Sequence, residues 1–122
     1  MTTARELTDQ MASMLRNERG ALADFLLAFS DFHENKRWRE LGYGSAFPYL
    51  RGELKLSAGA AYNRLAAAEL IQRFPEVEAA VRSGQLCFST VHEVAKVLTP
   101  ENKDEVLPRF FGLSRRRPRP AR

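Results

Sequence analysis

The sequence predicts an all-α protein folded as one compact multi-helix globule, and three observations lead there. Apolar residues recur at helical spacing along most of the chain, strand-like alternation never persists, and glycine, proline and capping residues cut the pattern into short segments. A chain of 122 residues with 44% apolar residues builds one core. We expect a single helical domain over residues 1–112, followed by a disordered basic tail, rich in arginine and proline, over residues 113–122.

The N-terminal third is predicted to form two helices. The first covers residues 4–17, and Gly20 lies just beyond its end. Its apolar positions at helical spacing are Leu7, Met11, Met14 and Leu15. The second covers residues 21–39 and has an apolar face too broad for an isolated surface helix. That face is formed by Leu22, Phe25, Leu26, Phe29, Phe32 and Trp38.

The middle of the chain is predicted to form a short helix and a longer one joined by a tight turn. The glycines of LGYGS end the preceding helix, and Ser45 can cap a helix over residues 46–54. Ser57 can cap the next helix, which extends to about Arg73 and is alanine-rich. We therefore expect a helix-turn-helix over about residues 45–73.

Three further helices are expected after residue 74. Pro75 and Gly84 suit the first turn and the C-terminal end of one helix. Ser89 is the expected cap of the second. Thr99 is the expected N-cap of the third, with Pro100 in its first turn and Pro108 closing or interrupting it.

The positive charge of the chain is concentrated in two places. The formal net charge is +4, and residues 36–73 alone carry seven basic and three acidic side chains. The end of the chain, RRRPRPAR, carries five arginines. A local excess of this kind predicts a basic face toward an anionic partner.

Several classes of function are not expected. No apolar run approaches the roughly 20 residues that cross a bilayer, and no signal peptide is visible, so we expect a cytoplasmic protein without a membrane partner. The single cysteine, Cys87, and the histidines His33 and His92 do not form a metal-ligand or catalytic pattern. We expect no enzyme activity, no cofactor and no small-molecule substrate.

The predicted helix-turn-helix is the candidate site, because in such motifs the N-terminal end of the second helix enters the major groove. Ala61, Leu65 and Ala68 would pack against the preceding helix. Asparagine and arginine can read base edges, and basic side chains and helix N-termini can contact phosphates. The candidate DNA-binding residues are Ser57, Tyr62, Asn63, Arg64, Arg51, Lys55 and Arg73. The alternative is that these side chains are merely solvated on a helix that only packs.

Two resemblances support the DNA-binding interpretation. KLSAGAAYNRLAAAELI followed by FPEVEAAVRSGQL resembles the helix-turn-helix region of the chromosome-partitioning ParB proteins. LGYGS, LSAGAAYNRL, RFPEVEAAVRSGQL and LTPEN, in that order, resemble the helical domain N-terminal to the nuclease in many bacterial HNH endonuclease proteins. The second resemblance implies an accessory domain that binds or targets double-stranded DNA for a metal-dependent nuclease.

The sequence departs from that family after GLS, where the arginine-rich tail takes the place of further helix. The HNH nuclease is missing, so the chain is either a truncated relative or a stand-alone module. A competing hypothesis is a helical protein-interaction or regulatory domain. It would self-associate, as a homodimer, through the aromatic residues Phe25, Phe29, Phe32 and Trp38.

Overall fold

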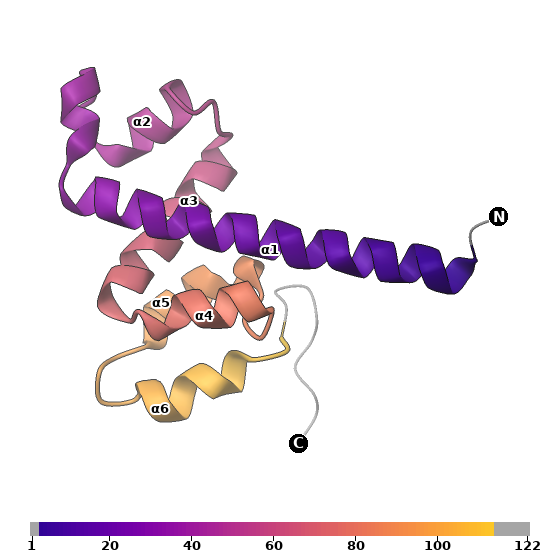
Figure 1. Ribbon diagram of the computed structural model, residues 1–122. Helices are drawn as coiled ribbons and strands as arrows, with labels where there is room; N and C mark the ends of the chain where they lie inside the picture. Colours follow the sequence, from indigo (N-terminus) through magenta and orange to yellow (C-terminus); the bar gives the residue numbers. More distant parts are fainter. Residues whose placement is uncertain (1–2, 114–122) are drawn as a thin grey trace.

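The structure is a computed structural model that describes residues 3–113. This part of the chain contains helices and no strand, which confirms the all-α prediction (Figure 1). The predicted basic tail falls almost entirely outside the described residues. The α-helices are α1 (Ala4–Glu34), α2 (Ala46–Gly52), α3 (Ala58–Arg73), α4 (Glu76–Ser83), α5 (Val91–Val97) and α6 (Lys103–Val106). The 3-10 helices are η1 (Arg37–Leu41), η2 (Phe88–Thr90) and η3 (Leu107–Phe110).

The prediction of two N-terminal helices is wrong, because α1 is one continuous helix of 31 residues. Gly20 lies inside it, where a glycine costs only about 1 kcal/mol relative to alanine. The burial of Ala23, Leu26 and Phe29 in the second half of α1 offsets that cost. Thr3 begins the helix with a capping box, in which its hydroxyl accepts from the Glu6 N–H and Glu6 accepts from the Thr3 N–H.

The second predicted helix also ends earlier than residue 39. The side-chain amide and N–H of Asn35 both donate to the Asp31 carbonyl, and Lys36 adopts a left-handed conformation with φ 52°. The chain then turns into η1, which places the buried Trp38 in a cluster with Phe29, Tyr49 and Leu50. The reversal after Glu34 thus brings Trp38, the only tryptophan of the chain, into the core.

Helix α3 is the centre of the fold and packs against α1, α2, α4 and α5. Its small residues Ala61, Ala67 and Ala68 are fully buried, which allows the neighbouring helices to approach closely. Two core clusters lie on either side of it. One is aromatic and lies between α1, η1 and α2; the other is aliphatic and joins α1 and α3 to the helices that follow.

The C-terminal helices match the prediction from the sequence at α4 and depart from it after α4. Pro75 and Gly84 flank α4 as expected, and Gly84 has φ 85°. Ser89 does not cap α5; its hydroxyl contacts the sulfur of Cys87, and η2 precedes α5. Thr99 makes the capping-box bonds expected of an N-cap, since its hydroxyl accepts from the Asn102 N–H and the Asn102 side chain accepts from the Thr99 N–H, but residues 100–102 form a turn and α6 begins only at Lys103.

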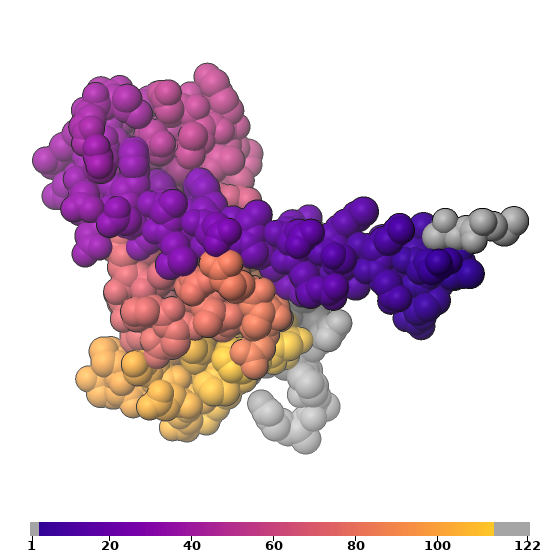
Figure 2. Space-filling model, in the orientation of Figure 1, coloured from indigo at the N-terminus to yellow at the C-terminus, as the bar shows by residue number. Residues whose placement is uncertain are grey.

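Ion pairs connect the helices around the core. Arg82 of α4 bonds Asp24 of α1 at 2.8 Å and Glu78 of its own helix at 2.6 Å. Lys103 of α6 bonds Glu76 of α4 at 3.0 Å. The N-terminal half of α1 extends beyond these contacts and projects from the globule (Figures 1 and 2). Within residues 3–113, no helix combines the length and apolar character that a membrane crossing requires.

Candidate nucleic-acid interface

The connection between α2 and α3 is short and held by its own backbone. Glu53 and Leu54 donate to the Tyr49 carbonyl, and Leu56 donates to the Leu50 carbonyl. Lys55 lies at the turn with φ 62°, a left-handed conformation that favours glycine. The Arg51 guanidinium reaches over the turn and donates to the Leu56 carbonyl at 3.3 Å. The turn therefore presents two exposed basic side chains.

The first turn of α3 is open to solvent. Ser57 caps the helix as predicted, because its hydroxyl accepts from the Ala60 N–H at 3.2 Å. Ser57, Ala58 and Gly59 are exposed, and a Cβ added to Gly59 would meet nothing within 4 Å. Small residues at an exposed helix start let a ligand approach the unpaired N–H groups of that turn.

Tyr62 extends the open surface by one turn. Its side chain is 54% exposed, and its ring meets His92 of α5 edge-on at 6.2 Å. Asn63, the neighbouring residue, is half-buried. The sequence did not single out His92 for this surface, because helical periodicity along one segment says nothing of which other helix packs beside it.

The two remaining candidates lie elsewhere. Arg64 stacks over the Phe88 ring at 5.4 Å and its guanidinium lies 3.4 Å from the Ala60 carbonyl, so it lies on the far flank of α3 from Tyr62. Arg73 is at the other end of the helix, where it donates to the Leu98 carbonyl and stacks on Phe74. A helix of 16 residues is about 24 Å long, so Arg73 is separate from the turn.

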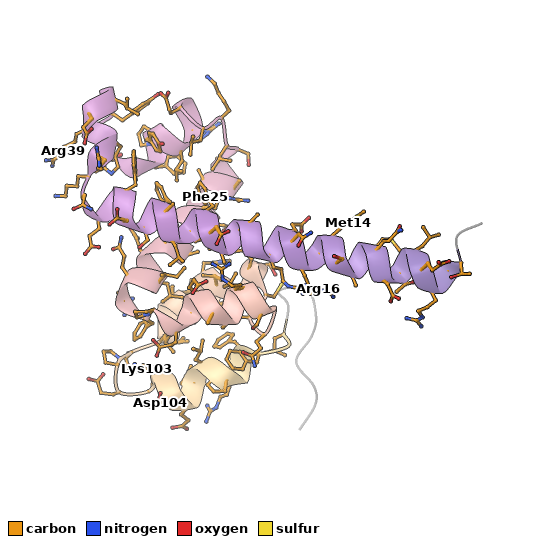
Figure 3. All side chains as sticks on the ribbon, in the orientation of Figure 1. Met14, Arg16, Phe25, Arg39, Lys103 and Asp104 are labelled. Atoms are coloured by element: carbon orange, nitrogen blue, oxygen red, sulfur yellow. The ribbon has the colours of Figure 1, made fainter. Side chains whose placement is uncertain are left out.

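The seven basic residues between 36 and 73 do not form one face. Those of η1 and those of the α2–α3 turn lie at opposite ends of α2 (Figures 1 and 3). Arg37 is paired with Glu40 at 2.9 Å, and Arg39 stacks on Trp38. The surface around the turn consists instead of Arg51, Lys55, the first turn of α3 and Tyr62; we call it the α3 N-terminal surface.

An acidic residue borders this surface and is held by a neighbour. Glu53 accepts a hydrogen bond from the Tyr43 hydroxyl at 2.9 Å. That bond to a carboxylate, together with burial, raises the pKa of Tyr43 above its ordinary value. The Glu53 carboxylate is therefore held toward Tyr43 rather than left free beside Lys55.

Among residues 3–113, no group of three or more histidine, cysteine, aspartate or glutamate side chains could hold a metal ion. Comparison of the chain with protein-family models, with curated proteins and with solved structures finds no match. The function must therefore be argued from the arrangement of the chain's own residues.

Proposed function

We propose that the protein is a DNA-binding helical module in which α2 and α3 act as a helix-turn-helix. The observation that carries the proposal is the open first turn of α3 beside two exposed basic side chains, Arg51 and Lys55. A helix N-terminus bordered by cations suits a phosphate, because its N–H groups and its dipole both favour negative charge. The module carries no chemistry of its own in this proposal.

Each residue of the α3 N-terminal surface has a proposed role. Lys55 and Arg51 contact phosphates on either side of the groove, and the N–H groups near Ser57 bind a third. Tyr62 and its neighbour Asn63, which lies beside the surface in the sequence, reach the base edges, where an asparagine can pair with adenine. Arg64 and Arg73 remain candidate contacts, although their bonds within the fold favour the other residues.

The test is fluorescence anisotropy of the full chain with duplex DNA at several salt concentrations. A phosphate interface predicts a steep fall in affinity with salt. Lys55→Ala and Arg51→Ala should each reduce the slope of log K against log salt by about one, since each removes one phosphate contact. Arg5→Ala is the matched control: it removes the same charge from the projecting part of α1 and should leave the slope unchanged.

A truncation separates the helix surface from the arginine-rich end. Removal of residues 115–122 should weaken binding evenly across sequences, whereas Asn63→Ala should weaken binding to a preferred sequence more than to others. Loss of all binding on truncation, with no effect of Lys55→Ala, would show that the arginines act alone and would contradict the proposal.

We further propose kinship with the helical domain that precedes HNH nucleases, with the same targeting role. The support is the order of the LGYGS, LSAGAAYNRL and RFPEVEAAVRSGQL segments in the sequence. A nuclease coding region next to this one in the genome would support the kinship, and Mg²⁺-dependent nicking by this chain alone would contradict a role without chemistry.

A further inference from the structure

The N-terminal half of α1 carries an apolar stripe that the fold leaves uncovered. Four large side chains on it are between 46% and 64% exposed, namely Leu7, Met11, Met14 and Leu15. They follow one another at helical spacing on one side of the helix. Figure 3 shows Met14 on the same side of α1 as Phe25, with Arg16 on the other side. The stripe therefore continues along the helix toward the globule.

Where α1 meets the globule, the same side of the helix borders a hollow of about 690 Å³. Its floor on α1 is formed by Glu18, Ala21, Leu22 and Phe25, and its wall by Leu54, Leu56, Arg64 and Phe88. The wall is mostly apolar, and Leu54 is 40% exposed. One helix thus carries an apolar ridge at residues 7–15 and, on the same side, an apolar hollow at residues 18–25.

We infer that the partner of this surface is a second copy of the chain, with the two α1 helices antiparallel. A two-fold axis across α1 near residue 16 places each ridge in the hollow of the other copy. Such an interface is self-complementary, as a two-fold dimer requires. A stable complex buries roughly 800 Å² per partner, and the ridge alone is too small to supply that area. In the two-fold arrangement each copy buries both its ridge and its hollow, which enlarges the contact.

The arginine-rich C-terminal segment does not suit the apolar ridge. Residues 114–122, SRRRPRPAR, carry five arginines and no large apolar side chain. The order of ridge and hollow along α1 selects the orientation. An antiparallel pair sets the ridge at residues 7–15 opposite the hollow at residues 18–25 of the other copy, whereas a parallel pair in register would set ridge against ridge and leave both hollows uncovered.

The test measures the association of the full chain by sedimentation equilibrium. Met11→Glu combined with Met14→Glu should weaken dimerisation about a hundredfold or more, because charges would enter an apolar contact. Leu27→Glu is the matched control, since Leu27 is an exposed leucine on the opposite side of α1 and should leave the dissociation constant within about threefold.

Spin labels distinguish the orientations. The label is attached at Arg5→Cys in a Cys87→Ser background. In the antiparallel dimer, residue 5 of one copy lies opposite residue 27 of the other, so the two labels are separated by about 22 residues along the helices. At a rise of about 1.5 Å per residue this distance is about 33 Å. A parallel pair would bring the two labels close together and would overturn the antiparallel assignment.

Three other results would overturn the dimer itself: a monomer at all concentrations, equal weakening by Leu27→Glu, or a monomer that binds anionic phosphatidylserine vesicles through the stripe. None depends on DNA binding. Failure here would leave the proposed function standing, and failure of the DNA test would leave the dimer standing.

Discussion

At the scale of single residues, Lys55 combines a strained backbone with an exposed charge. Its φ of 62° is in the left-handed region, which costs a side-chain-bearing residue about 1–2 kcal/mol. Lys55→Gly should therefore raise the free energy of unfolding by about 1 kcal/mol and also weaken DNA binding. Urea denaturation and anisotropy measure the two effects.

Lys55→Ala separates these effects, because alanine removes the charge and keeps the strain. It should weaken DNA binding as much as Lys55→Gly does, without the gain in stability. A loss of stability in Lys55→Gly would contradict the assignment of strain, and unchanged DNA binding in both variants would remove Lys55 from the interface.

His33 is the second residue whose role follows from its bonds. Its Nδ1 accepts from Nε1 of the buried Trp38 at 3.2 Å, so its Nε2–H donates to Glu69 of α3 at 3.0 Å. His33→Phe keeps the stack on Phe29 but leaves the buried tryptophan N–H without an acceptor. We expect a loss of about 1–3 kcal/mol in the free energy of unfolding, which tryptophan fluorescence measures during urea denaturation.

Glu69→Gln is the control for His33→Phe. The amide oxygen of the introduced glutamine still accepts from the His33 Nε2–H, and the site is partly exposed. It should change the free energy of unfolding by less than about 0.5 kcal/mol. An equal effect of both variants would show that the Glu69 contact, and not the tryptophan bond, carries the stability.

At the scale of elements, the ends of the helices differ in how far the local sequence determines them. The caps of α3 and α4 could be predicted because Ser57, Pro75 and Gly84 act on residues next to them in the chain. The prediction that a helix ends before Gly20 is wrong, because a glycine inside a helix and one after its end have the same local sequence pattern. Burial of the following turns against distant residues decides between them, and no local pattern reports that burial.

The continuity of α1 predicts that Gly20 can be replaced. A Cβ at this position would meet only the end of the Arg82 side chain, at 4.0 Å, which is an ordinary contact. Gly20→Ala should raise the free energy of unfolding by about 0.5–1 kcal/mol, because alanine loses less backbone entropy in a helix. Thermal unfolding measures the change.

Gly84→Ala is the opposite case, since Gly84 has φ 85° and its Cβ would lie 2.9 Å from Nε of Arg19. It should be destabilising. A stabilising Gly84→Ala, or a destabilising Gly20→Ala, would contradict the two backbone assignments.

The start of α1 should depend on pH. Hydrogen bonds from the Thr3 N–H and hydroxyl hold the pKa of Glu6 below its ordinary value of 4.5. A carboxylate whose pKa is lowered by folding stabilises the folded state at pH values above its pKa in the unfolded chain. This stabilisation is lost as the pH falls through the pKa of the folded state. The protection factors of the first-turn amides, taken against the intrinsic exchange rate at each pH, should therefore fall as the pH drops below 4.5.

Thr3→Ala provides the comparison for Glu6, since it removes the capping hydroxyl at neutral pH. It should accelerate exchange in the same turn without acid, because an isolated helix of this length is marginal in water. If neither acid pH nor Thr3→Ala lowers the protection of these amides, other contacts hold the first turn.

At the scale of the whole molecule, the fold divides into a packed globule and an extension. The globule holds both core clusters and the ion pairs of Arg82 and Lys103. The sequence predicted its fold class and the packing of α2 on α3. It did not predict that Phe29 and Trp38 would be buried while Met11 and Met14 would be exposed, because all four follow the same helical spacing. The aromatic residues proposed for self-association thus belong largely to the core.

This division predicts that the extension can be removed. Residues 3–11 and 13–18 are exposed, whereas Arg19 packs on Gly84, so a chain that lacks residues 1–15 keeps the contacts of both cores. At concentrations where both proteins are monomeric, its thermal midpoint should lie within a few degrees of the full chain's. At higher concentrations only the full chain should gain stability, because a partner that binds the folded state stabilises it by mass action. Calorimetry over a range of concentrations makes the comparison, and a truncated chain that unfolds would mean that the extension belongs to the globule.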